Sequence, residues 1–206
     1  MDVITAVFSE FPEIMTPRLR LRRMGPLDAF ALFDVLSDDA VARNFGIDTF
    51  TDMEQAHQRI RQIDANFRHR RTLRWAVARR DNNLLIGSCG YVSWRPAFHQ
   101  AAIGYELHRS YWRQGLMSEA LTAVINFGLT QMQLHRLEAL VLPENTPSRA
   151  LLTKLGFQQE GLLREYGFWR GEFHDLYIYA LLKQDWLAGY GRLSADAFPL
   201  GEYDEA

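Results

Sequence analysis

Residues 101–120 read AAIGYELHRSYWRQGLMSEA, and this stretch decides the fold class. Apolar residues alternate with other residues over 101–107, which is typical of a half-buried strand. A tight loop follows, then a helix expected over about 116–132, and then another strand expected over 136–142. A helix that connects two strands in this way predicts a right-handed crossover and a locally parallel pair.

The rest of the chain predicts a mixed sheet with helices on its faces. Further strands are expected over 18–22, 73–77, 84–92, 157–168 and 173–182, and further helices over 26–36, 52–67 and 147–155. Turn-like residues between neighbouring strands, such as Arg170-Gly171, predict hairpins and therefore antiparallel pairs. The order of elements predicts an α/β fold whose sheet is mostly antiparallel with one parallel pair.

Length and composition restrict the classes of protein that remain. The 206 residues fit one domain, 1–206, with a core over about 16–186 and a C-terminal tail over 187–206. A net charge of -2 and an isoelectric point near 6.3 argue against binding to nucleic acid or acidic lipid through bulk charge. Cys89 is the only cysteine, which excludes an internal disulfide and a cysteine-based zinc site. With no apolar run of about 18 residues and no basic-then-apolar start, we expect a reduced, cytoplasmic protein.

Gly115 marks the chemically informative part of the 101–120 stretch. A glycine lets the backbone approach a ligand closely, and the first N–H groups of a helix have no partners within the helix. Such a helix start suits a phosphate or pyrophosphate, and Arg113 adds a charge next to it. The alternative is a simple strand-to-helix turn that needs a glycine.

A second block of residues lies downstream, and the two blocks together resemble a known superfamily. The motifs are Gln114-Gly115-x-Met117-x-Glu119-Ala120, Asn145-x-x-Ser148, Gly156-Phe157 and Gly171-x-Phe173-His174-Asp175, preceded by Arg18-Leu19-Arg20-Leu21-Arg22. In order and spacing they resemble the GNAT superfamily of N-acetyltransferases, in the branch that contains the ribosomal-protein N-terminal acetyltransferases RimJ and RimL. The resemblance covers nearly the whole chain and implies the GNAT fold, a central twisted sheet flanked by helices.

The resemblance implies acetyl-CoA as the acetyl donor. The residues expected to bind it are Leu107, Arg109, Arg113, Gln114, Gly115, Leu116, Met117, Ser118, Asn145 and Ser148. The superfamily loop starts with Arg or Gln three residues before its glycine and has Gly or Ala two residues after it, whereas this chain has Trp112 and Met117 there. Backbone amides do the binding in this branch, so the departure changes which atoms contact the phosphates rather than whether the site exists.

Two glutamates are candidates for the general base that accepts a proton from the acceptor amine. Glu106 lies just before the loop, on a strand face that it shares with Ala102 and Gly104, small residues that leave room for a substrate. Glu138 lies on a strand that is apolar on both faces, where an acid is rarely buried without a partner or a role. An ion pair is the alternative for each. It is equally expected for Glu106, and for Glu138 we favour a pair with Arg136 or another arginine.

Ser148 is the candidate general acid that protonates the leaving thiolate, and Tyr166 is the substitute. In the family that the chain resembles, the matching serine stands near the departing sulfur. Asn145 and Ser148 are also compatible with nothing more than a turn and a helix cap. The strand that holds Leu107 is the simplest source of N–H donors for the thioester oxygen.

We therefore expect an acetyl-CoA-dependent N-acetyltransferase in which the α-amine of a protein or peptide attacks the thioester directly, in a ternary complex. An α-amine titrates at about 8 and a lysine side chain at about 10.4, so the α-amine is already partly unprotonated at neutral pH. A small amine is the alternative acceptor, and a non-catalytic acyl-CoA-binding sensor is the alternative class of protein.

The expected partners follow from the same analogy. A ribosomal protein is one candidate, and no nucleic acid or membrane is expected. No metal site is expected either, because the Glu54-x-x-His57 spacing lacks the second copy that a carboxylate-bridged metal requires. The chain is expected to be a monomer or a homodimer. Segments 38–52, 94–100 and 166–174 are expected to decide which acceptor fits.

Overall fold

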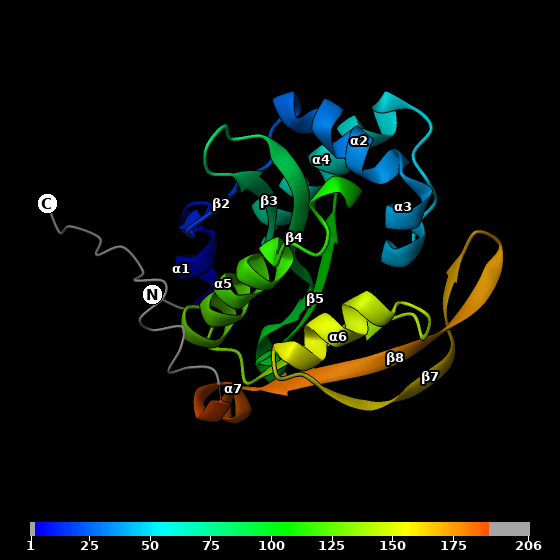
Figure 1. The fold of residues 1–206 in the computed structure, drawn as a ribbon. Coiled ribbons are helices and arrows are strands. Elements are labelled where there is room, and N and C mark those ends of the chain that lie inside the picture. The colour runs from blue at the N-terminus through cyan, green and yellow to red at the C-terminus, as the bar shows by residue number, and fades with distance from the viewer. Residues whose placement is uncertain (1–2, 190–206) are drawn as a thin grey trace, which may run out of the picture.

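The computed structural model describes residues 3–189, and its eight strands form one twisted sheet (Figure 1). The strands are β1 (Ile14–Met15), β2 (Leu19–Arg22), β3 (Arg74–Arg79), β4 (Leu85–Arg95), β5 (Gln100–Leu107), β6 (Arg136–Val141), β7 (Gln158–Trp169) and β8 (Glu172–Leu182). The α-helices of this part of the chain are α1 (Val3–Ser9), α2 (Ala29–Ser37), α3 (Asp39–Phe45), α4 (Met53–Arg68), α5 (Leu116–Thr130), α6 (Thr146–Lys154) and α7 (Lys183–Gly189).

The sheet has the strand order β1-β2-β3-β4-β5-β6-β8-β7. Of the strand pairs in the described residues, β5 with β6 is the parallel one, and the others are antiparallel. Helix α5 connects the two parallel strands. The mixed α/β sheet with one parallel pair that the sequence predicts is therefore confirmed.

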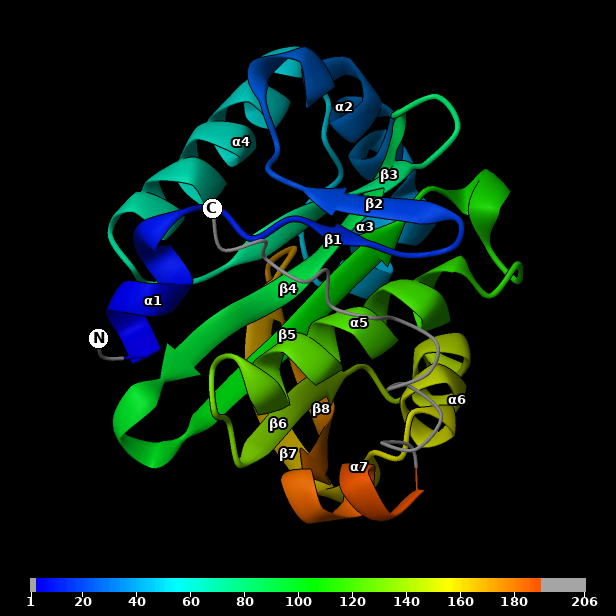
Figure 2. The same cartoon turned by 90° about the vertical axis from the view of Figure 1, so that its left-hand side faces the viewer.

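Helices cover both faces of the sheet. Figure 1 shows α5 on one side of β4 and β5 and α3 on the other, and Figure 2 shows α5 in front of the same strands. On β3, Trp75 and Val77 belong to the core that α5 fills, whereas Ala76 between them packs with α2 and α4. Side chains of a strand alternate between the two faces of a sheet, so β3 contributes to both cores.

Helices α4 and α5 form for different reasons. Helix α5 is apolar nearly all round and lies against the sheet with most of its length buried. Helix α4 is amphipathic, with Ile60, Ile63 and Phe67 on its buried side. Asp52 caps its start by accepting a hydrogen bond from the N–H of Glu54 at 2.8 Å. In the described part of the chain, no helix is long and apolar enough to cross a membrane.

Some elements differ from what the sequence predicts. Helices α1 and α3 were not expected, because each has seven residues and no extended apolar stripe. Strand β4 runs to Arg95, beyond the end expected at residue 92. Its pairing with β5 shifts register between Tyr91 and Ser93, and the strand continues past this irregularity. Helix α7 reaches into the tail expected over 187–206, and Trp186 at its centre is only 2% exposed. Residues 190–206 of that tail lie outside the described residues.

Candidate active site

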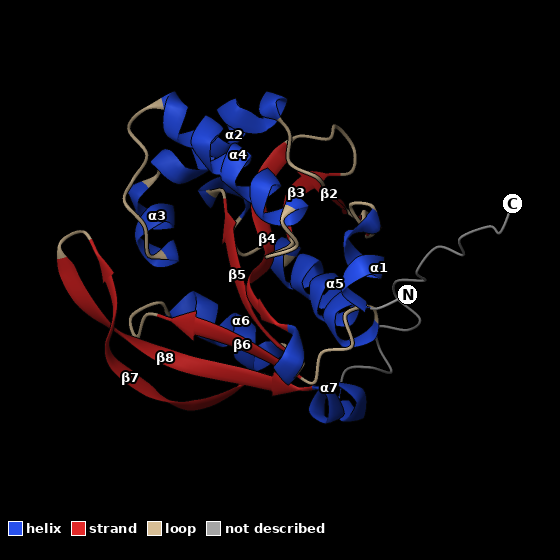
Figure 3. Cartoon of the chain, turned by 180° about the vertical axis from the view of Figure 1, so that it is seen from behind, coloured by secondary structure: helices blue, strands red, loops and turns tan. Residues whose placement is uncertain are grey.

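Strands β5 and β6 separate part-way along their length. They pair from Gln100 with Arg136 to Ala102 with Glu138, and their pairing stops there. Figure 3 shows the two strands together at one end and apart at the other. The second half of β5 therefore has one edge without a strand partner, directly before the loop that leads to α5.

The backbone of β5 directs hydrogen-bonding groups into this gap. His108 donates its N–H to the C=O of Ile86, on the β4 side, at 2.8 Å. Because the N–H groups of a strand alternate in direction, those of Leu107 and Tyr105 point away from β4 and toward the gap. The indole N–H of Trp112 donates to the C=O of Leu107 at 2.7 Å and so closes the end of this edge. The main-chain groups of Tyr105 and Leu107 therefore have no strand partner on this edge.

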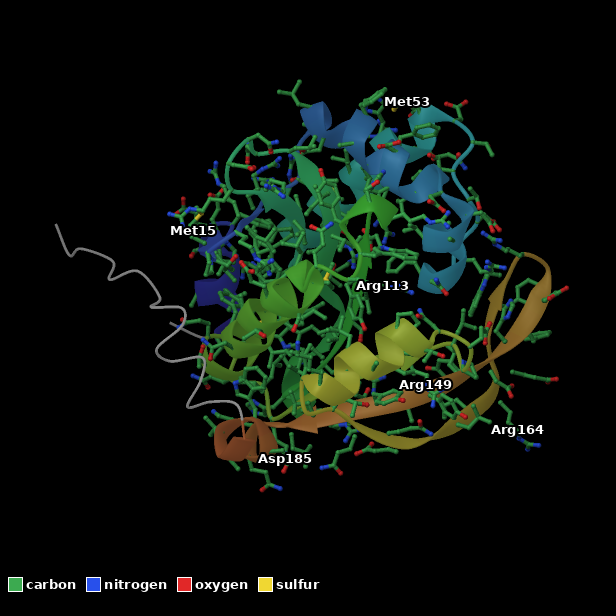
Figure 4. The ribbon with its side chains drawn as sticks, viewed as in Figure 1. Met15, Met53, Arg113, Arg149, Arg164 and Asp185 are labelled. Atoms are coloured by element: carbon green, nitrogen blue, oxygen red, sulfur yellow. The ribbon has the colours of Figure 1, made fainter. Side chains whose placement is uncertain are left out.

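The loop between β5 and α5 presents the start of the helix to solvent. Gly115 is the N-cap with a φ of 73°, and Arg113 also has a positive φ of 60°. The N–H of Glu119 donates to the C=O of Gly115 at 3.0 Å, which leaves the N–H groups of residues 116–118 without partners in the helix. Arg113 lies between the first turn of α5 and α6 (Figure 4). The residues expected to bind phosphate therefore lie together at one helix start.

Arg18 and Glu119 support this loop from the N-terminal part of the chain. Arg18 donates to the C=O of Gln114 at 2.9 Å and to Oε2 of Glu119 at 2.6 Å. Oε1 of Glu119 accepts hydrogen bonds from the hydroxyl of Thr16 at 2.6 Å and from the N–H of Arg18 at 2.8 Å. Burial by itself raises the pKa of Glu119, but these hydrogen bonds outweigh burial and hold the pKa below its ordinary value. Both residues stood in the sequence motifs, yet only the structure shows that they form one unit.

Ser148 lies in the first turn of α6 and contacts β5. Asn145 caps this helix by accepting a hydrogen bond from the N–H of Ser148 at 3.2 Å. Oγ of Ser148 lies 2.7 Å from the hydroxyl oxygen of Tyr105. Burial raises the pKa of Tyr105 to about 12, so its hydroxyl keeps its proton at neutral pH. Sequence reasoning placed Tyr105 on the strand but did not identify it as a partner of Ser148.

Glu106 is held in an ion pair on the opposite face of β5. Its side chain is only 3% exposed, and its two oxygens accept hydrogen bonds from Arg74 and from the hydroxyl of Ser88. The structural pair that was one of the two expected interpretations is therefore present. The room expected on this strand face is filled, because a Cβ on Gly104 would lie 2.8 Å from Cγ1 of Val92 and 3.6 Å from Nη1 of Arg74.

Glu138 has the ion pair that the sequence favoured. Nε of Arg136 donates to Oε1 of Glu138 at 2.7 Å, and Nη1 donates to Oε1 of Glu160 at 3.0 Å. Hydrogen bonding to Glu160, and then to Glu138, raises the pKa of Arg136 above its ordinary value despite partial burial. The carboxylate of Glu138 is therefore occupied by an arginine.

Tyr166 lies on the β7–β8 hairpin, where its side chain is 59% exposed. No residue of the described chain hydrogen-bonds to its hydroxyl, whereas the hydroxyl of Ser148 meets Tyr105. The structure thus brings Tyr105, rather than Tyr166, to the serine.

A family model described as the acetyltransferase (GNAT) domain matches residues 18–158, which include β5, the glycine loop, α5, β6 and α6. This chain belongs to the GNAT family of acetyltransferases. The match confirms the resemblance seen in the motifs. GNAT acetyltransferases use acetyl-CoA, the cofactor that the sequence predicts.

The acetyltransferase has relatives along most of its length. It is 37% identical over 173 residues to the uncharacterized N-acetyltransferase YoaA of Bacillus subtilis (strain 168), covering 84% of this chain and 98% of the relative. It is 34% identical over 110 residues to the ribosomal protein uS5-alanine N-acetyltransferase of Escherichia coli (strain K12), covering 53% of this chain and 57% of that protein. The structure of Mycobacterium smegmatis RimJ in complex with CoA-disulfide has a TM-score of 0.73 and 27% identity, covering 86% of this chain and 94% of that one.

In this acetyltransferase the tip of the β7–β8 hairpin lies beside α3 (Figures 1 and 3). Arg170 at the tip contacts Oδ1 of Asp39 at 2.8 Å and donates to the hydroxyl of Thr49 at 2.8 Å. Hydrogen bonds from Thr49 and then from Arg170 lower the pKa of Asp39. The ring of Trp169 lies 3.6 Å from the position of a Cβ on Gly46. The structure thus joins two of the segments expected to decide the acceptor, 38–52 and 166–174.

Proposed function

We propose that this chain transfers the acetyl group of acetyl-CoA to the α-amine of a protein or peptide, with both substrates bound at once and with the cytoplasm as its location. The observation that carries the proposal is the gap between β5 and β6. Main-chain donors of β5 point into it, and the Tyr105–Ser148 pair stands beside it. The N-acetyltransferase names of the relatives, one of them a ribosomal protein uS5-alanine enzyme, support an amino-terminal acceptor and a ribosomal protein as one candidate partner.

The start of α5 fits the pyrophosphate of coenzyme A. The N–H groups of residues 116–118 carry partial positive charge and have no partner within the helix. Gly115 has a φ of 73°, a conformation that favours glycine, and glycine has no side chain that would cover this end of the helix. The residues that we assign to the cofactor are Leu107, Arg109, Arg113, Gln114, Gly115, Leu116, Met117, Ser118, Asn145 and Ser148.

The groups along the gap suit acyl transfer. Bound acetyl-CoA supplies a thioester whose carbonyl carbon is open to attack by an amine. In this proposal the N–H of Leu107 stabilises negative charge on the carbonyl oxygen. In the same proposal Ser148 gives a proton to the departing sulfur and Tyr105, at 2.7 Å, replaces it. The nitrogen gives up its second proton as the amide forms, and this proton restores the one that Tyr105 lost. Because the pKa of Tyr105 is about 12, its hydroxyl is a proton donor at neutral pH.

Neither candidate base is free, so we propose that the amine loses its proton to water. Glu106 is bonded to Arg74 and Ser88, and Glu138 is bonded to Arg136. An α-amine with a pKa of about 8 is partly unprotonated at neutral pH, whereas a lysine side chain with a pKa of about 10.4 is almost entirely protonated. A site without a free base therefore favours α-amines.

Release of free thiol from acetyl-CoA tests this proposal. One set of peptides has a free α-amine and no lysine, and a matched set has a blocked amino terminus and one lysine. We expect kcat/KM at pH 7.5 to be about 200-fold higher for the first set, because the pKa values of the two amines differ by about 2.4. Turnover with small amines but with neither set of peptides would show that the acceptor is a small amine and not a peptide. Tight binding of CoA with no thiol release from any amine would show a sensor instead of an enzyme.

A further inference from the structure

Arg59 on α4 is a half-buried arginine without an acidic partner. Within residues 3–189, no carboxylate lies at ion-pair distance from its guanidinium. Other arginines of the same helix have such partners, since Arg61 pairs with Glu54 and Arg68 with Asp64. An unpaired charge that is partly removed from water is costly, so Arg59 needs an explanation of its own.

Phe45 places this arginine beside β5. The ring centroid of Phe45 lies 5.8 Å from Cζ of Arg59 and 5.1 Å from Cζ of Arg74. Cε2 of the same ring lies 3.7 Å from the position of a Cβ on Gly104. Gly104 directly precedes Tyr105, on the part of β5 that borders the gap. The guanidinium of Arg59 is therefore separated from the edge of the gap by a single aromatic ring.

The cluster contains one carboxylate, that of Glu106, for two arginines. Both oxygens of Glu106 are already used, one by Arg74 and one by Ser88. Burial lowers the pKa of Arg59 and the charge of Arg74 lowers it further, while the charge of Glu106 acts in the opposite direction. A guanidinium nevertheless stays protonated at neutral pH. Arg59, Arg74 and Glu106 together therefore carry one excess positive charge.

The cluster lies on the side of the gap that faces away from α5. Val92, which contacts Gly104, is 48% exposed, so solvent reaches this face of the sheet. The amide of Asn145 donates to the C=O of Asn44 at 3.4 Å, which holds the end of α3 next to the start of α6. Phe45 follows Asn44 directly, so the cluster stands where an acceptor would approach a thioester held in the gap.

We propose that Arg59, supported by Phe45 and Arg74, binds a carboxylate of the acceptor close to the reacting amine. The acceptor is then a peptide with an acidic residue at its first or second position, or a free amino acid. This inference rests on the proposed function, because it describes the acceptor of that reaction. The positive charge of the cluster also lowers the pKa of a nearby amine, because it disfavours the protonated form of that amine. This effect helps an enzyme whose glutamates are held in ion pairs and do not act as the base.

Equilibrium binding to the enzyme saturated with CoA tests this proposal without turnover. The probes are alanyl-glutamyl and alanyl-glutaminyl peptide amides, aspartyl and asparaginyl peptide amides, and alanine with alaninamide. We expect the carboxylate member of at least one pair to bind at least tenfold more tightly. The pair that shows the preference identifies the source of the carboxylate.

Variants of α4 connect this preference to Arg59. Arg59→Gln is expected to reduce the preference to less than threefold, and Arg59→Lys is expected to keep part of it because the charge remains. Arg61→Gln is the matched control, since Arg61 lies on the same helix, is exposed and pairs with Glu54. It is expected to leave the preference unchanged. Thermal unfolding of each variant shows whether it is folded. If Arg59→Gln does not fold, the change in carboxylate preference is measured with Arg59→Lys.

Two outcomes overturn the proposal. One is equal affinity within every pair, and the other is a preference that persists in Arg59→Gln. Thiol release separates this inference from the proposed function. A preference that depends on Arg59 without any thiol release supports the binding site and refutes acetyl transfer. Thiol release with no carboxylate preference supports acetyl transfer and refutes the role of Arg59.

Discussion

The donor side and the acceptor side of this site are built in different ways. The donor side consists mainly of backbone from one stretch of chain, the free edge of β5 followed by the glycine loop and the first turn of α5. The acceptor side that we propose consists of side chains from separate elements, with Phe45 on α3, Arg59 on α4, Arg74 on β3 and Arg170 at the hairpin tip.

This difference predicts how each side responds to mutation. A backbone site depends on φ angles and on the direction of N–H groups, so a change of conformation damages it and most side-chain changes do not. A side-chain site can change one residue at a time while the fold stays the same. We therefore expect donor-side variants to alter acetyl-CoA binding or turnover for every acceptor, and acceptor-side variants to alter only the choice of acceptor.

Gly115→Val is expected to have the largest effect, because it breaks the donor side at its backbone. A β-branched residue at a φ of 73° is strained, so the loop must shift and its N–H groups lose their direction. We expect the affinity for acetyl-CoA to fall at least ~100-fold, which corresponds to ~2.7 kcal/mol. The measurement is the rise in melting temperature that saturating acetyl-CoA produces, which the variant should lose.

Gly171→Val is the matched control for this strain. Gly171 has a φ of 75° at the tip of the β7–β8 hairpin, and apart from its two chain neighbours no residue of the described chain lies within 4 Å of the position of its Cβ. The two valines carry similar backbone strain, so Gly171→Val should retain the rise in melting temperature. Equal loss in both variants would show that general destabilisation, and not the loop, causes the effect.

Ser148→Ala and Tyr105→Phe test whether the donor side separates binding from chemistry. We expect each to lower kcat by about 10- to 100-fold while the Kd for acetyl-CoA changes by less than about threefold. If the proton passes along the pair, the double variant should lose no more activity than the more damaging single variant. Additive losses would mean that the two hydroxyls act separately.

Tyr91→Phe controls for the loss of a buried hydroxyl. Tyr91 lies on β4, and its hydroxyl donates to the C=O of Val124 on α5 at 2.6 Å. Its removal costs one buried hydrogen bond, so the melting temperature should fall. Because this hydroxyl lies outside the gap, kcat should stay close to that of the wild-type enzyme.

The donor side could be predicted from sequence because its signals are contiguous. Gly115 follows a strand pattern and precedes a helix pattern, and the strand and helix patterns on either side also predict the parallel pair. The Tyr105–Ser148 contact joins residues that are 43 positions apart, and no local pattern predicts a distance between two elements. Glu106 was placed correctly on β5, but its partner Arg74 comes from β3 and reaches it across β4.

The acceptor side was harder to predict for a related reason. Helix α3 has seven residues and begins after the Asp38 cap, so it offers too few positions for a periodic apolar pattern. The contact between Arg170 and Asp39 depends on where the hairpin tip ends in space. Segments 38–52 and 166–174 could be named as segments expected to decide the acceptor, but no local pattern predicts their contact with each other.

Glu119→Gln tests the support beneath the donor loop. The pKa of Glu119 is lowered in the folded protein, so its ionised form stabilises the fold above the ordinary pKa of a glutamate, and this stabilisation is lost as the pH falls through the folded pKa. We expect the variant to lose ~1–3 kcal/mol in its free energy of unfolding at pH 7, the range for a hydrogen bond to a charged group with a buried partner. Urea unfolding at several pH values should show the difference from wild type shrinking below a pH of about 4.3. Glu54→Gln, which affects an exposed pair with Arg61, should show no such change with pH.

Arg170→Ala is expected to have the smallest effect, and it tests the independence of the two sides most directly. Its contacts with Asp39 and Thr49 are exposed, and exposed ion pairs contribute little to stability, so the melting temperature should stay within about 2 °C of wild type. The hairpin tip would then move more freely beside α3, which should raise the KM for the acceptor by about two- to fivefold and leave the Kd for acetyl-CoA unchanged. Arg164→Ala is the control, because Arg164 lies on the same hairpin and projects away from the rest of the molecule (Figure 4). A change in acetyl-CoA affinity as large as the change in acceptor KM would mean that the hairpin tip also shapes the donor side, and the division between a backbone-built half and a side-chain-built half would then fail.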